Sequence, residues 1–338
     1  MWKISNLLNK MEKDDFQVYL LFSPININYL SNYNPEGWAC CKVCENPVIY
    51  CTSMDYENAK NTSDIDVKLI NSIADFFNDL KGINKIAIEP SLTYNLYSKL
   101  MDDFEIGAVN YINELRMIKS DEEITKITRA TKIAQESLLE LDFKINNEKL
   151  LSYEFGRIMR EKGAFSESFP TILASGSNTS LPHSIPLNKS LEKPILIDWG
   201  CIFEGYCSDN TRTIVYTEKE HEVFDIVLEA HDKAIDAIKP GLKCSDIDKI
   251  ARDIISDYGY GDKFIHGLGH GVGLEVQESP SLFYKNDLIL EKGMVVTVEP
   301  GIYLEGEFGV RIEDTIEIQN SAKIIGNLPI EVNIDLPF

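Results

Sequence analysis

Two carboxylates in the second half of this 338-residue chain lie beside apolar, β-rich runs. Asp198 ends a run that begins at Pro194, and Asp209 precedes a second run that ends at Tyr216. Gly205 lies between them, so the pattern predicts a β-hairpin or two adjacent strands. A buried carboxylate is costly without a compensating cation, and two close carboxylates raise each other's pKa. The pair therefore indicates either a shared proton or a bound metal.

A second strand pair is predicted near the C-terminus, and it repeats the first. Glu299 ends an apolar run that begins at Met294, and Glu313, like Asp209, is followed two residues later by a threonine. Helical patterns precede both pairs. This similarity predicts an α/β (α+β) domain of two halves related by a pseudo-twofold axis, with carboxylates from both halves meeting at the axis.

The segment 264–273 lies between the two pairs and contains two histidines and four glycines in ten residues. A glycine has no Cβ, so another group can approach its backbone closely. We therefore expect these glycines to leave room for a substrate beside His266 and His270. The four are Gly267, Gly269, Gly271 and Gly273.

Convergence of the four carboxylates with His270 would form a metal site. Four neighbouring carboxylates do not all stay ionised without cations, because like charges raise each other's pKa. Protonated pairs are one alternative, but oxygen ligands with one imidazole are the set that two divalent ions require. Such ions lie about 3.5–4 Å apart, and a water that bridges them becomes a hydroxide nucleophile near neutral pH. The set favours manganese or cobalt, with zinc or iron as alternatives.

Composition limits which binding partners and which cellular compartment are expected for this protein. The formal net charge of −21 repels phosphate backbones, so no nucleic-acid partner is expected. No apolar run has the length of a membrane span, and the N-terminus lacks a signal-peptide core, so we expect a cytoplasmic protein without a membrane partner. Cys41 and Cys44 have zinc-ligand spacing, but there is no second such pair. Buried free thiols are the favoured interpretation of the cluster Cys40, Cys41, Cys44 and Cys51.

The periodicity predicts two domains, residues 1–115 and 116–338. In the first, an α/β unit, strands are expected at 18–22, 48–50 and 85–89, and a helix at 67–80. In the second, Ser120 and Glu123 form a capping box that opens a long helix. Further helices are expected at 150–162, 219–238 and 245–258. The first domain shows no phosphate-binding loop or catalytic triad, and we expect it to support or gate the second.

These segments resemble the metallopeptidases with the pita-bread fold, peptidase family M24, a group that includes aminopeptidase P, prolidase, methionine aminopeptidase and creatinase. The resemblance covers about residues 110–330 and, by position and size, the N-terminal domain. It implies a pita-bread catalytic domain preceded by a smaller creatinase-like domain. It also implies that Asp198 chelates one metal, that Asp209 and Glu313 bridge both, and that His270 and Glu299 bind the second.

Two short segments are similar to the aminopeptidase P/prolidase branch. Residues 311–315 read Arg-Ile-Glu-Asp-Thr, and residues 115–120 read Leu-Arg-Met-Ile-Lys-Ser. From residue type alone, a single loop histidine such as His183 is more often without function. In this branch, however, His183 matches a histidine that lines the pocket near the proline side of the scissile bond. His266 matches one that lies beside the metals and positions the substrate, and Arg311 is expected to bind substrate with them.

Two positions depart from the branch pattern. Gln277 stands in Val-Gln-Glu where the family usually has Val-His-Glu, and that histidine hydrogen-bonds the substrate carbonyl or stabilises the tetrahedral intermediate. Gln277 donates a hydrogen bond but carries no charge and shuttles no proton. Ser281 stands where many prolidases have an arginine that would clamp the free carboxylate of a dipeptide. This second departure favours an aminopeptidase over a strict dipeptidase.

The resemblance implies a dinuclear-metal Xaa-Pro peptidase that hydrolyses the bond between an N-terminal residue and proline through a metal-bridging hydroxide. The expected catalytic residues are His183, His266, Glu299 and Gln277, with Glu299 relaying the proton. The expected partner is a peptide with proline in second position, and a homodimer is implied. The alternatives are another pita-bread hydrolase, either creatinase-like or a non-prolyl aminopeptidase, and a non-catalytic peptide-binding relative.

Overall fold

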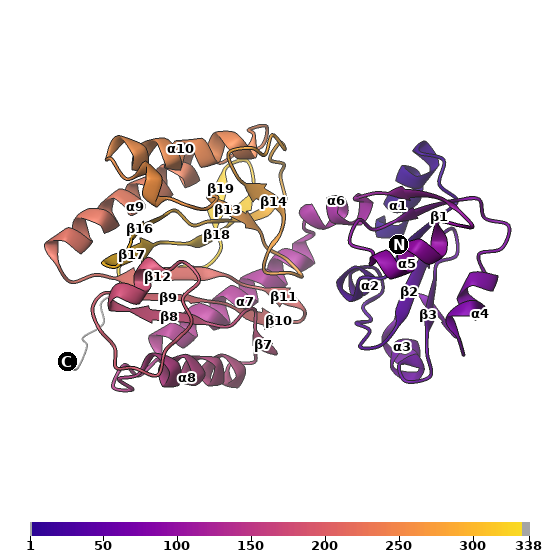
Figure 1. The fold of residues 1–338 in the computed structure, drawn as a ribbon, viewed down its shortest axis with the longest axis horizontal. Helices are drawn as coiled ribbons and strands as arrows, with labels where there is room; N and C mark the ends of the chain where they lie inside the picture. Colours follow the sequence, from indigo (N-terminus) through magenta and orange to yellow (C-terminus); the bar gives the residue numbers. More distant parts are fainter. Residues whose placement is uncertain (1, 333–338) are drawn as a thin grey trace. The chain divides into compact units, whose positions relative to one another are not determined.

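The computed structural model describes residues 2–332, and the chain divides into two compact units, Met1–Leu115 and Arg116–Phe338. Figure 1 shows the elements of each unit. Among the described residues, no helix combines the length and the apolar character needed to cross a bilayer.

The first unit is built on a mixed six-stranded sheet. β1 (Val18–Leu21) pairs in parallel with β5 (Lys85–Ile88) and antiparallel with β2 (Ala39–Val43). The strands predicted at 18–22, 48–50 and 85–89 are confirmed as β1, β3 (Val48–Cys51) and β5. In spatial order the strands are β4 (Asp66–Leu69), β3 (Val48–Cys51), β2 (Ala39–Val43), β1 (Val18–Leu21), β5 (Lys85–Ile88) and β6 (Glu105–Ala108). The helices are α1 (Trp2–Lys13), α2 (Pro24–Ser31), α3 (Tyr56–Thr62), α4 (Ile73–Asn78), α5 (Tyr94–Leu100) and α6 (Tyr111–Met117).

The predicted helix at 67–80 is wrong in its first part. Residues 66–69 form β4, an edge strand that pairs in parallel with β3, and only Ile73–Asn78 are helical. β4 lies at the sheet edge and buries none of its four side chains fully, so burial does not impose a strand periodicity on its sequence. The helix begins at a capping box formed by Ser72 and Asp75.

The cysteine cluster occupies two neighbouring strands of this sheet. Cys40 and Cys41 are buried on β2 and Cys51 is buried on β3, as predicted, whereas Cys44 is partly exposed. Burial raises the pKa of Cys41 to about 12, which keeps it a protonated thiol at neutral pH. These side chains therefore pack as small apolar groups within the sheet.

The second unit places its strands between α9 and α10 on one side and α7 and α8 on the other (Figure 1). The helices are α7 (Asp121–Leu139), α8 (Glu148–Glu161), α9 (Glu218–Ala237) and α10 (Cys244–Asp257), with short 3-10 turns η1 (Gly176–Ser180) and η2 (Gly261–Lys263). One sheet has the order β14 (Glu278–Leu282), β13 (Gly269–Gly271), β15 (Val295–Val298), β18 (Asp314–Ile318) and β19 (Ala322–Ile324). The smaller sheets are β12 (Asn210–Ile214), β9 (Ile195–Trp199) and β8 (Ile172–Ser175); β11 (Tyr206–Cys207), β10 (Cys201–Phe203) and β7 (Ser166–Glu167); and β16 (Gly301–Leu304) with β17 (Phe308–Arg311).

The four predicted helices of this unit are confirmed to within two residues at their starts. The capping box before α7 is present: the Ser120 N–H donates to Glu123 Oε2 at 2.8 Å, and the Glu123 N–H donates to Ser120 Oγ at 3.4 Å. Thr217 and Glu220 form a second capping box at the start of α9. Local capping chemistry therefore stabilises the first turns of α7 and α9, whereas α10 begins without a side-chain cap.

Both predicted strand pairs form, with more breaks than the sequence pattern indicates. β9 pairs antiparallel with β12, and the segment between them folds as the small hairpin β10–β11, with Gly205 at φ 84° in its turn. In the second pair, Pro300 divides the first run into β15 and β16, which pair with β18 and β17 respectively. A proline has no N–H to donate to a strand ladder, which explains the break.

Each half of the unit has its own apolar core. In the first half, defined as α7, α8 and β7–β12, Leu151 and Phe155 of α8 share a buried cluster with Ile197 of β9. In the second half, defined as α9, α10 and β13–β19, Val227 of α9 shares a buried cluster with Val296 of β15. The two halves meet at an isolated antiparallel bridge between Thr211 and Glu313.

Candidate metal centre

The strand register of the first half brings Asp198 and Asp209 together. Thr211 of β12 lies opposite Asp198 of β9, and Asp209 directly precedes β12. Because alternate residues of a strand share one face, Asp209 and Thr211 point to the same side. Asp198 and Asp209 are therefore diagonal neighbours on one face of the sheet.

The second half positions Glu299 and Glu313 by an equivalent arrangement. Val298 of β15 lies opposite Asp314 of β18, so the next positions along the two strands are Glu299 and Glu313. The Glu313 N–H donates to the Thr211 carbonyl at 3.1 Å, which connects this strand end to the first half. The four carboxylates thus belong to two neighbouring strand pairs joined at Thr211.

His270 lies in the centre of β13, and its hydrogen bonds define which nitrogen faces the carboxylates. Its Nδ1 is 3.1 Å from the carbonyl oxygen of Gly271. A carbonyl only accepts, so Nδ1 carries the proton and Nε2 presents a lone pair. Nε2 lies 3.3 Å from Glu299 Oε1 and 3.7 Å from Asp209 Oδ2, and burial lowers the pKa of His270. A neutral imidazole with its lone pair facing carboxylates is the form that ligates a metal.

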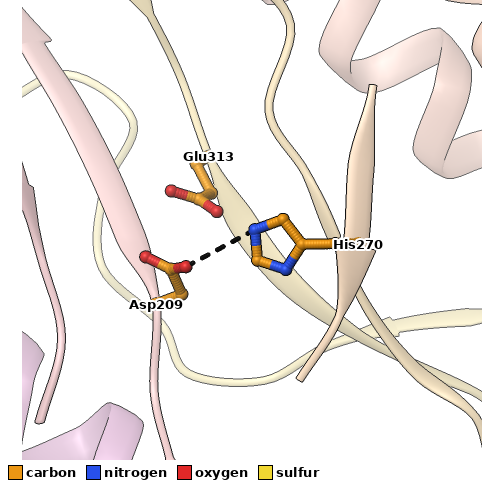
Figure 2. A group of neighbouring side chains, drawn as sticks. All are labelled: Asp209, His270 and Glu313. Carbon is orange, nitrogen blue, oxygen red and sulfur yellow. Dashed lines mark ion pairs between the residues drawn. The ribbon is translucent and has the colours of Figure 1, made fainter. Parts of the chain in front are cut away.

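Three of the predicted ligands form one tight cluster. The ligand atoms of Asp209, His270 and Glu313 all lie within 4.8 Å of one another, and Figure 2 shows the three side chains directed toward one another from separate segments of the chain. Glu299 adjoins the cluster through His270. Asp198 adjoins it through Arg311, whose Nη2 donates to Asp198 Oδ2 at 2.6 Å.

The donor set fits divalent metals on two observations. Among the described residues, Asp198 Oδ1 and Asp209 Oδ1 are buried acceptors without a hydrogen-bond donor. Burial, and then repulsion from neighbouring carboxylates, raises the pKa values of Asp209 and Glu313 well above their usual range. Burial raises the pKa of Glu299 to about 8. Excess negative charge and oxygen atoms without donors are both compensated when divalent cations bind here.

Arg311 provides the one strong cationic contact among the described neighbours of Asp198. Its Nε donates to Thr211 Oγ1 at 3.2 Å, and Thr211 Oγ1 donates to Glu313 Oε2 at 2.8 Å. Its Nη1 donates to the Tyr303 hydroxyl at 2.8 Å. Arg311 therefore orients carboxylates in both halves, Asp198 directly and Glu313 through Thr211. The resemblance implied that Arg311 binds substrate. In this structure its guanidinium contacts the proposed metal ligand Asp198 and the neighbouring Thr211.

His266 is connected to Arg311 through Tyr303. Its Nδ1 donates to the Gly267 carbonyl at 2.8 Å, so its Nε2 accepts the hydrogen bond from the Tyr303 hydroxyl at 2.9 Å. Burial and the Arg311 charge lower the pKa of His266 to about 4. His266 is therefore a neutral imidazole with both ring nitrogens engaged.

The other predicted substrate residues are exposed. His183 lies in the loop after η1, close enough to His266 to contribute to the lowering of that residue's pKa. Gln277 directly precedes β14, and Ser281 of β14 lies opposite His270 in the sheet register. The structure thus groups the five predicted ligands with Arg311 and His266, and it leaves His183 and Gln277 on the surface.

Thr211 and Tyr303 are members of the site that the sequence interpretation missed. Thr211 carries a signal, because each second carboxylate is followed two residues later by a threonine. In the structure these threonines are used reciprocally: Thr211 reaches Glu313, and Thr315 Oγ1 donates to the Asp209 carbonyl at 3.0 Å. Tyr303 has no comparable signal, since it lies eight residues before its partner on a different strand.

The expected role of the glycines as space for a substrate is wrong for two of them. A Cβ on Gly269 would lie 2.0 Å from the Thr297 carbonyl oxygen, and one on Gly271 would lie 2.4 Å from the Ser279 carbonyl oxygen. Both glycines are needed because neighbouring strands approach β13 closely. They position His270 by allowing the sheet to close around it.

Comparison with known proteins identifies the family. The family model for the creatinase/prolidase N-terminal domain matches residues 3–118, and that for metallopeptidase family M24 matches residues 122–320. The chain is 37% identical to an Xaa-Pro dipeptidase of Pyrococcus horikoshii, with 95% of each chain covered. A similar relative is the Xaa-Pro dipeptidase of Pyrococcus furiosus, at 36% identity over 95% of this chain and 96% of that one.

Solved structures give the same result. The prolidase from Pyrococcus horikoshii superposes with a TM-score of 0.94 at 36% identity, covering 97% of this chain and 99% of that one. The X-Pro aminopeptidase from Thermotoga maritima superposes with a TM-score of 0.90 at 32% identity, covering 97% and 98%. The predicted fold and branch are confirmed. This chain belongs to metallopeptidase family M24, in its aminopeptidase P/prolidase branch, with a pita-bread catalytic domain preceded by a creatinase/prolidase N-terminal domain.

Proposed function

We propose that this metallopeptidase is a dinuclear-metal Xaa-Pro peptidase, which hydrolyses the bond between an N-terminal residue and proline. The observation that carries the proposal is the cluster of Asp209, His270 and Glu313, whose ligand atoms lie within 4.8 Å of one another. Relatives named Xaa-Pro dipeptidase at 36–37% identity over nearly the whole chain support the substrate class.

The ligand set we propose is Asp198, Asp209, His270, Glu299 and Glu313. Asp209 and Glu313 would be shared between two ions, and the buried Asp198 Oδ1, which lacks a hydrogen-bond donor, would bind one of them. Bound divalent ions supply Lewis-acid polarisation of the scissile carbonyl and lower the pKa of the attacking water. The oxygen-rich donor set favours manganese or cobalt, with zinc or iron as alternatives.

The chain's own residues would keep the ligands in their metal-binding form. The Gly271 carbonyl holds the proton of His270 on Nδ1, so Nε2 stays available. The Arg311 guanidinium holds Asp198 through Oδ2 and leaves Oδ1 free. Glu299 would accept the proton of the attacking water on its carboxylate and deliver it to the departing proline nitrogen.

The substrate would be bound by groups around this cluster. The carboxylates attract the free ammonium group of the peptide's N-terminus. His183 is flanked by the exposed apolar side chains of Leu181 and Ile185, which we assign to the proline side of the scissile bond. His266 and Arg311 would position the peptide from the metal side, and Gln277 would donate a hydrogen bond to the substrate carbonyl.

Substrate length is a finer question on which the similar proteins differ. Two relatives are named dipeptidases, whereas a similar structure is named an X-Pro aminopeptidase. Ser281 cannot clamp a dipeptide's carboxylate as an arginine does. We therefore propose that peptides longer than Xaa-Pro are accepted as well.

A substrate panel tests this proposal. Purified, metal-stripped protein reconstituted with manganese or cobalt is assayed on Xaa-Pro dipeptides, Xaa-Pro-Yaa tripeptides, Met-Ala-Ser and creatine. We expect hydrolysis of the proline-containing peptides only, and none without metal. Hydrolysis of Met-Ala-Ser or creatine in preference would show another pita-bread hydrolase. A reconstituted protein that binds Xaa-Pro peptides without cleaving them would show a binding protein.

The remaining assignments rest on the resemblance and on the compact units. We propose that the protein is cytoplasmic and forms a homodimer. The molar mass of the full chain, measured by light scattering, tests the dimer. We also propose that residues 1–115 form the N-terminal domain and residues 116–338 the catalytic domain; the division of the chain into compact units supports this boundary.

A further inference from the structure

Glu148, in the first turn of α8, is a buried carboxylate outside the metal centre. Its side chain is 0% exposed. Oε1 accepts hydrogen bonds from the Ser175 N–H at 2.8 Å and the Ser175 hydroxyl at 2.6 Å, and Oε2 accepts one from the Leu187 N–H at 2.9 Å. Lys189 Nζ lies 3.6 Å from Oε1. Both oxygens are thus used, and the donors come from two separated points of the chain.

Those two points are the ends of the loop that carries His183. Ser175 ends β8, and Leu187 lies four residues beyond His183. Backbone hydrogen bonds reinforce the second end: the Glu148 N–H donates to the Lys189 carbonyl at 3.1 Å, and the Lys149 N–H donates to the Leu187 carbonyl at 3.1 Å. The Glu148 carboxylate therefore joins both ends of the loop at its base, together with Lys189, whose Nζ donates to the Ser175 carbonyl at 3.1 Å.

Between its two ends, the same loop is hydrogen-bonded to β17, the strand that ends at Arg311 beside the metal centre. The Gly309 N–H donates to Thr179 Oγ1 at 2.9 Å, and Arg311 Nη1 donates to the Pro182 carbonyl at 3.3 Å. Pro182 directly precedes His183. Glu148 at the base and Arg311 near the apex thus hold the His183 segment between them, although His183 itself is exposed.

We propose that Glu148 is a positioning residue for substrate binding, which acts by fixing the loop that presents His183 to the proline side of the substrate. This inference rests on the proposed Xaa-Pro specificity and deepens it. Thr179, before His183, is buried, whereas Leu181, Ile185 and Leu187 around His183 are exposed, so the part of the loop nearest His183 depends on its two attachments rather than on apolar packing.

The role requires a carboxylate. Glutamine has a single acceptor oxygen, and its amide nitrogen is a donor. In Glu148→Gln, the oxygen can still accept from Ser175, but the nitrogen would face the Leu187 N–H, so two donors would oppose each other. The base of the loop would then open at Leu187 while α8 keeps its length and packing.

The test is a double-mutant cycle on the full-length metal-loaded enzyme with an Xaa-Pro substrate. Glu148→Gln is compared with His183→Ala and with the double variant. Because small misplacements of a binding group have large kinetic effects, we expect each single variant to lower kcat/KM by about 10- to 100-fold, mainly through KM. The double variant should be no worse than His183→Ala by more than about threefold, since coupled residues are not additive. Multiplicative effects would overturn the proposal.

A second readout is independent of catalysis. Amide hydrogen exchange in the metal-free protein should be about tenfold or more faster over residues 176–191 in Glu148→Gln than in the wild type. Glu154→Gln, on the same helix but paired with Arg157 at the surface, is the matched control and should change neither readout. Unchanged exchange at 176–191 in Glu148→Gln would overturn the proposal whatever the activity.

Two further arms separate the outcomes. If Glu148→Gln does not fold, Ser175→Ala removes only the hydroxyl donor to Oε1 and should give the same pattern with smaller effects. If the wild type cleaves no Xaa-Pro peptide, the proposed function fails, and the exchange measurement still decides whether Glu148 fixes the loop.

Discussion

At Gln277 an exposed amide stands where the branch pattern has a histidine. The side chain precedes β14, beside the strand that carries His270. An amide donates a hydrogen bond to a carbonyl oxygen but does not gain charge as that oxygen becomes negative. At the residue scale, the role proposed for Gln277 would therefore limit how strongly the chain stabilises the developing oxyanion.

Replacing Gln277 by histidine should accelerate the reaction. One oxyanion donor contributes about 10²–10³ in rate, so a better donor should raise kcat about tenfold or more in Gln277→His. The measurement is kcat on an Xaa-Pro peptide at saturating metal, with Gln277→Ala as the control that should be slower than the wild type. Equal kcat values for Gln277→His and the wild type would mean that the amide already serves as an adequate donor.

Glu278, the next residue, forms buried ion pairs with two cationic residues of the segment 115–120. Its Oε1 accepts from Lys119 Nζ at 2.8 Å, and its Oε2 accepts from Arg116 Nη2 at 2.5 Å. The side chains of Arg116, Lys119 and Glu278 are only 5%, 1% and 7% exposed. Burial by itself would raise the pKa of Glu278, but the two cations lower it below its ordinary value.

Glu278→Gln should therefore destabilise the protein in a pH-dependent way. Removing one partner leaves buried cations uncompensated, which costs about 3–5 kcal/mol at pH 7. The folded-state pKa lies below the ordinary 4.5, so this contribution is complete above about pH 4.5 and is lost as the pH falls through the folded value. Urea unfolding of wild type and variant at pH 7 and pH 4 measures the difference, which should shrink at pH 4.

The matched control is Glu275→Gln. Glu275 accepts from the same Arg116 at 2.7 Å, but its side chain is 44% exposed. Solvent screens such a pair, so we expect a loss of about 1 kcal/mol or less. An equal loss in both variants would refute the assignment of the buried contact as the dominant one.

At the scale of elements, the metal centre depends on how closely β13 approaches β15. Gly269 has no room for a Cβ because the Thr297 carbonyl oxygen would lie at 2.0 Å. The His270 N–H also donates to Thr297 Oγ1 at 3.1 Å, which fixes the histidine relative to β15, the strand that directly precedes Glu299. The spacing between β13 and β15 therefore controls the distance between the side chains of His270 and Glu299.

Gly269→Ala should separate these strands and weaken metal binding. We expect a loss of stability of about 1–3 kcal/mol from overpacking, and at least tenfold weaker metal affinity by titration calorimetry. Gly267→Ala, where the nearest atom lies at 3.1 Å, is the control and should have a smaller effect on both quantities. Unaltered metal affinity in Gly269→Ala would show that the spacing is not decisive.

What the sequence could predict follows the range of the interactions involved. Helical periodicity is local and predicted α7, α8, α9 and α10 closely, and the local capping box of Ser120 and Glu123 predicted the start of α7. The five proposed ligands were chosen because their types and spacing resemble a family, and the structure brings three of them, Asp209, His270 and Glu313, into one cluster. The Arg311–Asp198 contact joins residues 113 apart, and Glu148 reads as an ordinary acidic residue at a helix start, so neither role has a local pattern. The prediction was wrong for Gly269 and Gly271 because the absence of a Cβ does not indicate which group fills the space beside the backbone.

At the scale of the whole molecule, all five proposed ligands lie in the second unit, and they come from both of its halves. Asp198 and Asp209 belong to the first half, and the other three belong to the second. Metal binding therefore favours the conformation in which the halves are joined, and it stabilises that unit by mass action.

Removal of metal should lower the unfolding temperature of the second unit selectively. At 1,000 times Kd, bound metal adds about 4 kcal/mol of stability, which corresponds to about 10 °C for a domain of this size. Differential scanning calorimetry of the full chain with manganese and with EDTA should show one transition that moves and one, from the first unit, that does not. Asp209→Asn should abolish the shift, and transitions that move together would contradict this division.

The bridge between Thr211 and Glu313 has a consequence for when hydrolytic activity first arises during synthesis. The first-half ligands are made early, and Glu313 follows only after β17, so a chain that ends before Glu313 has no complete set of the proposed ligands. A nascent chain that has not reached Glu313 therefore lacks one of the proposed metal ligands. On the proposed ligand set, hydrolytic activity requires the segment around Glu313 to join the first half at Thr211.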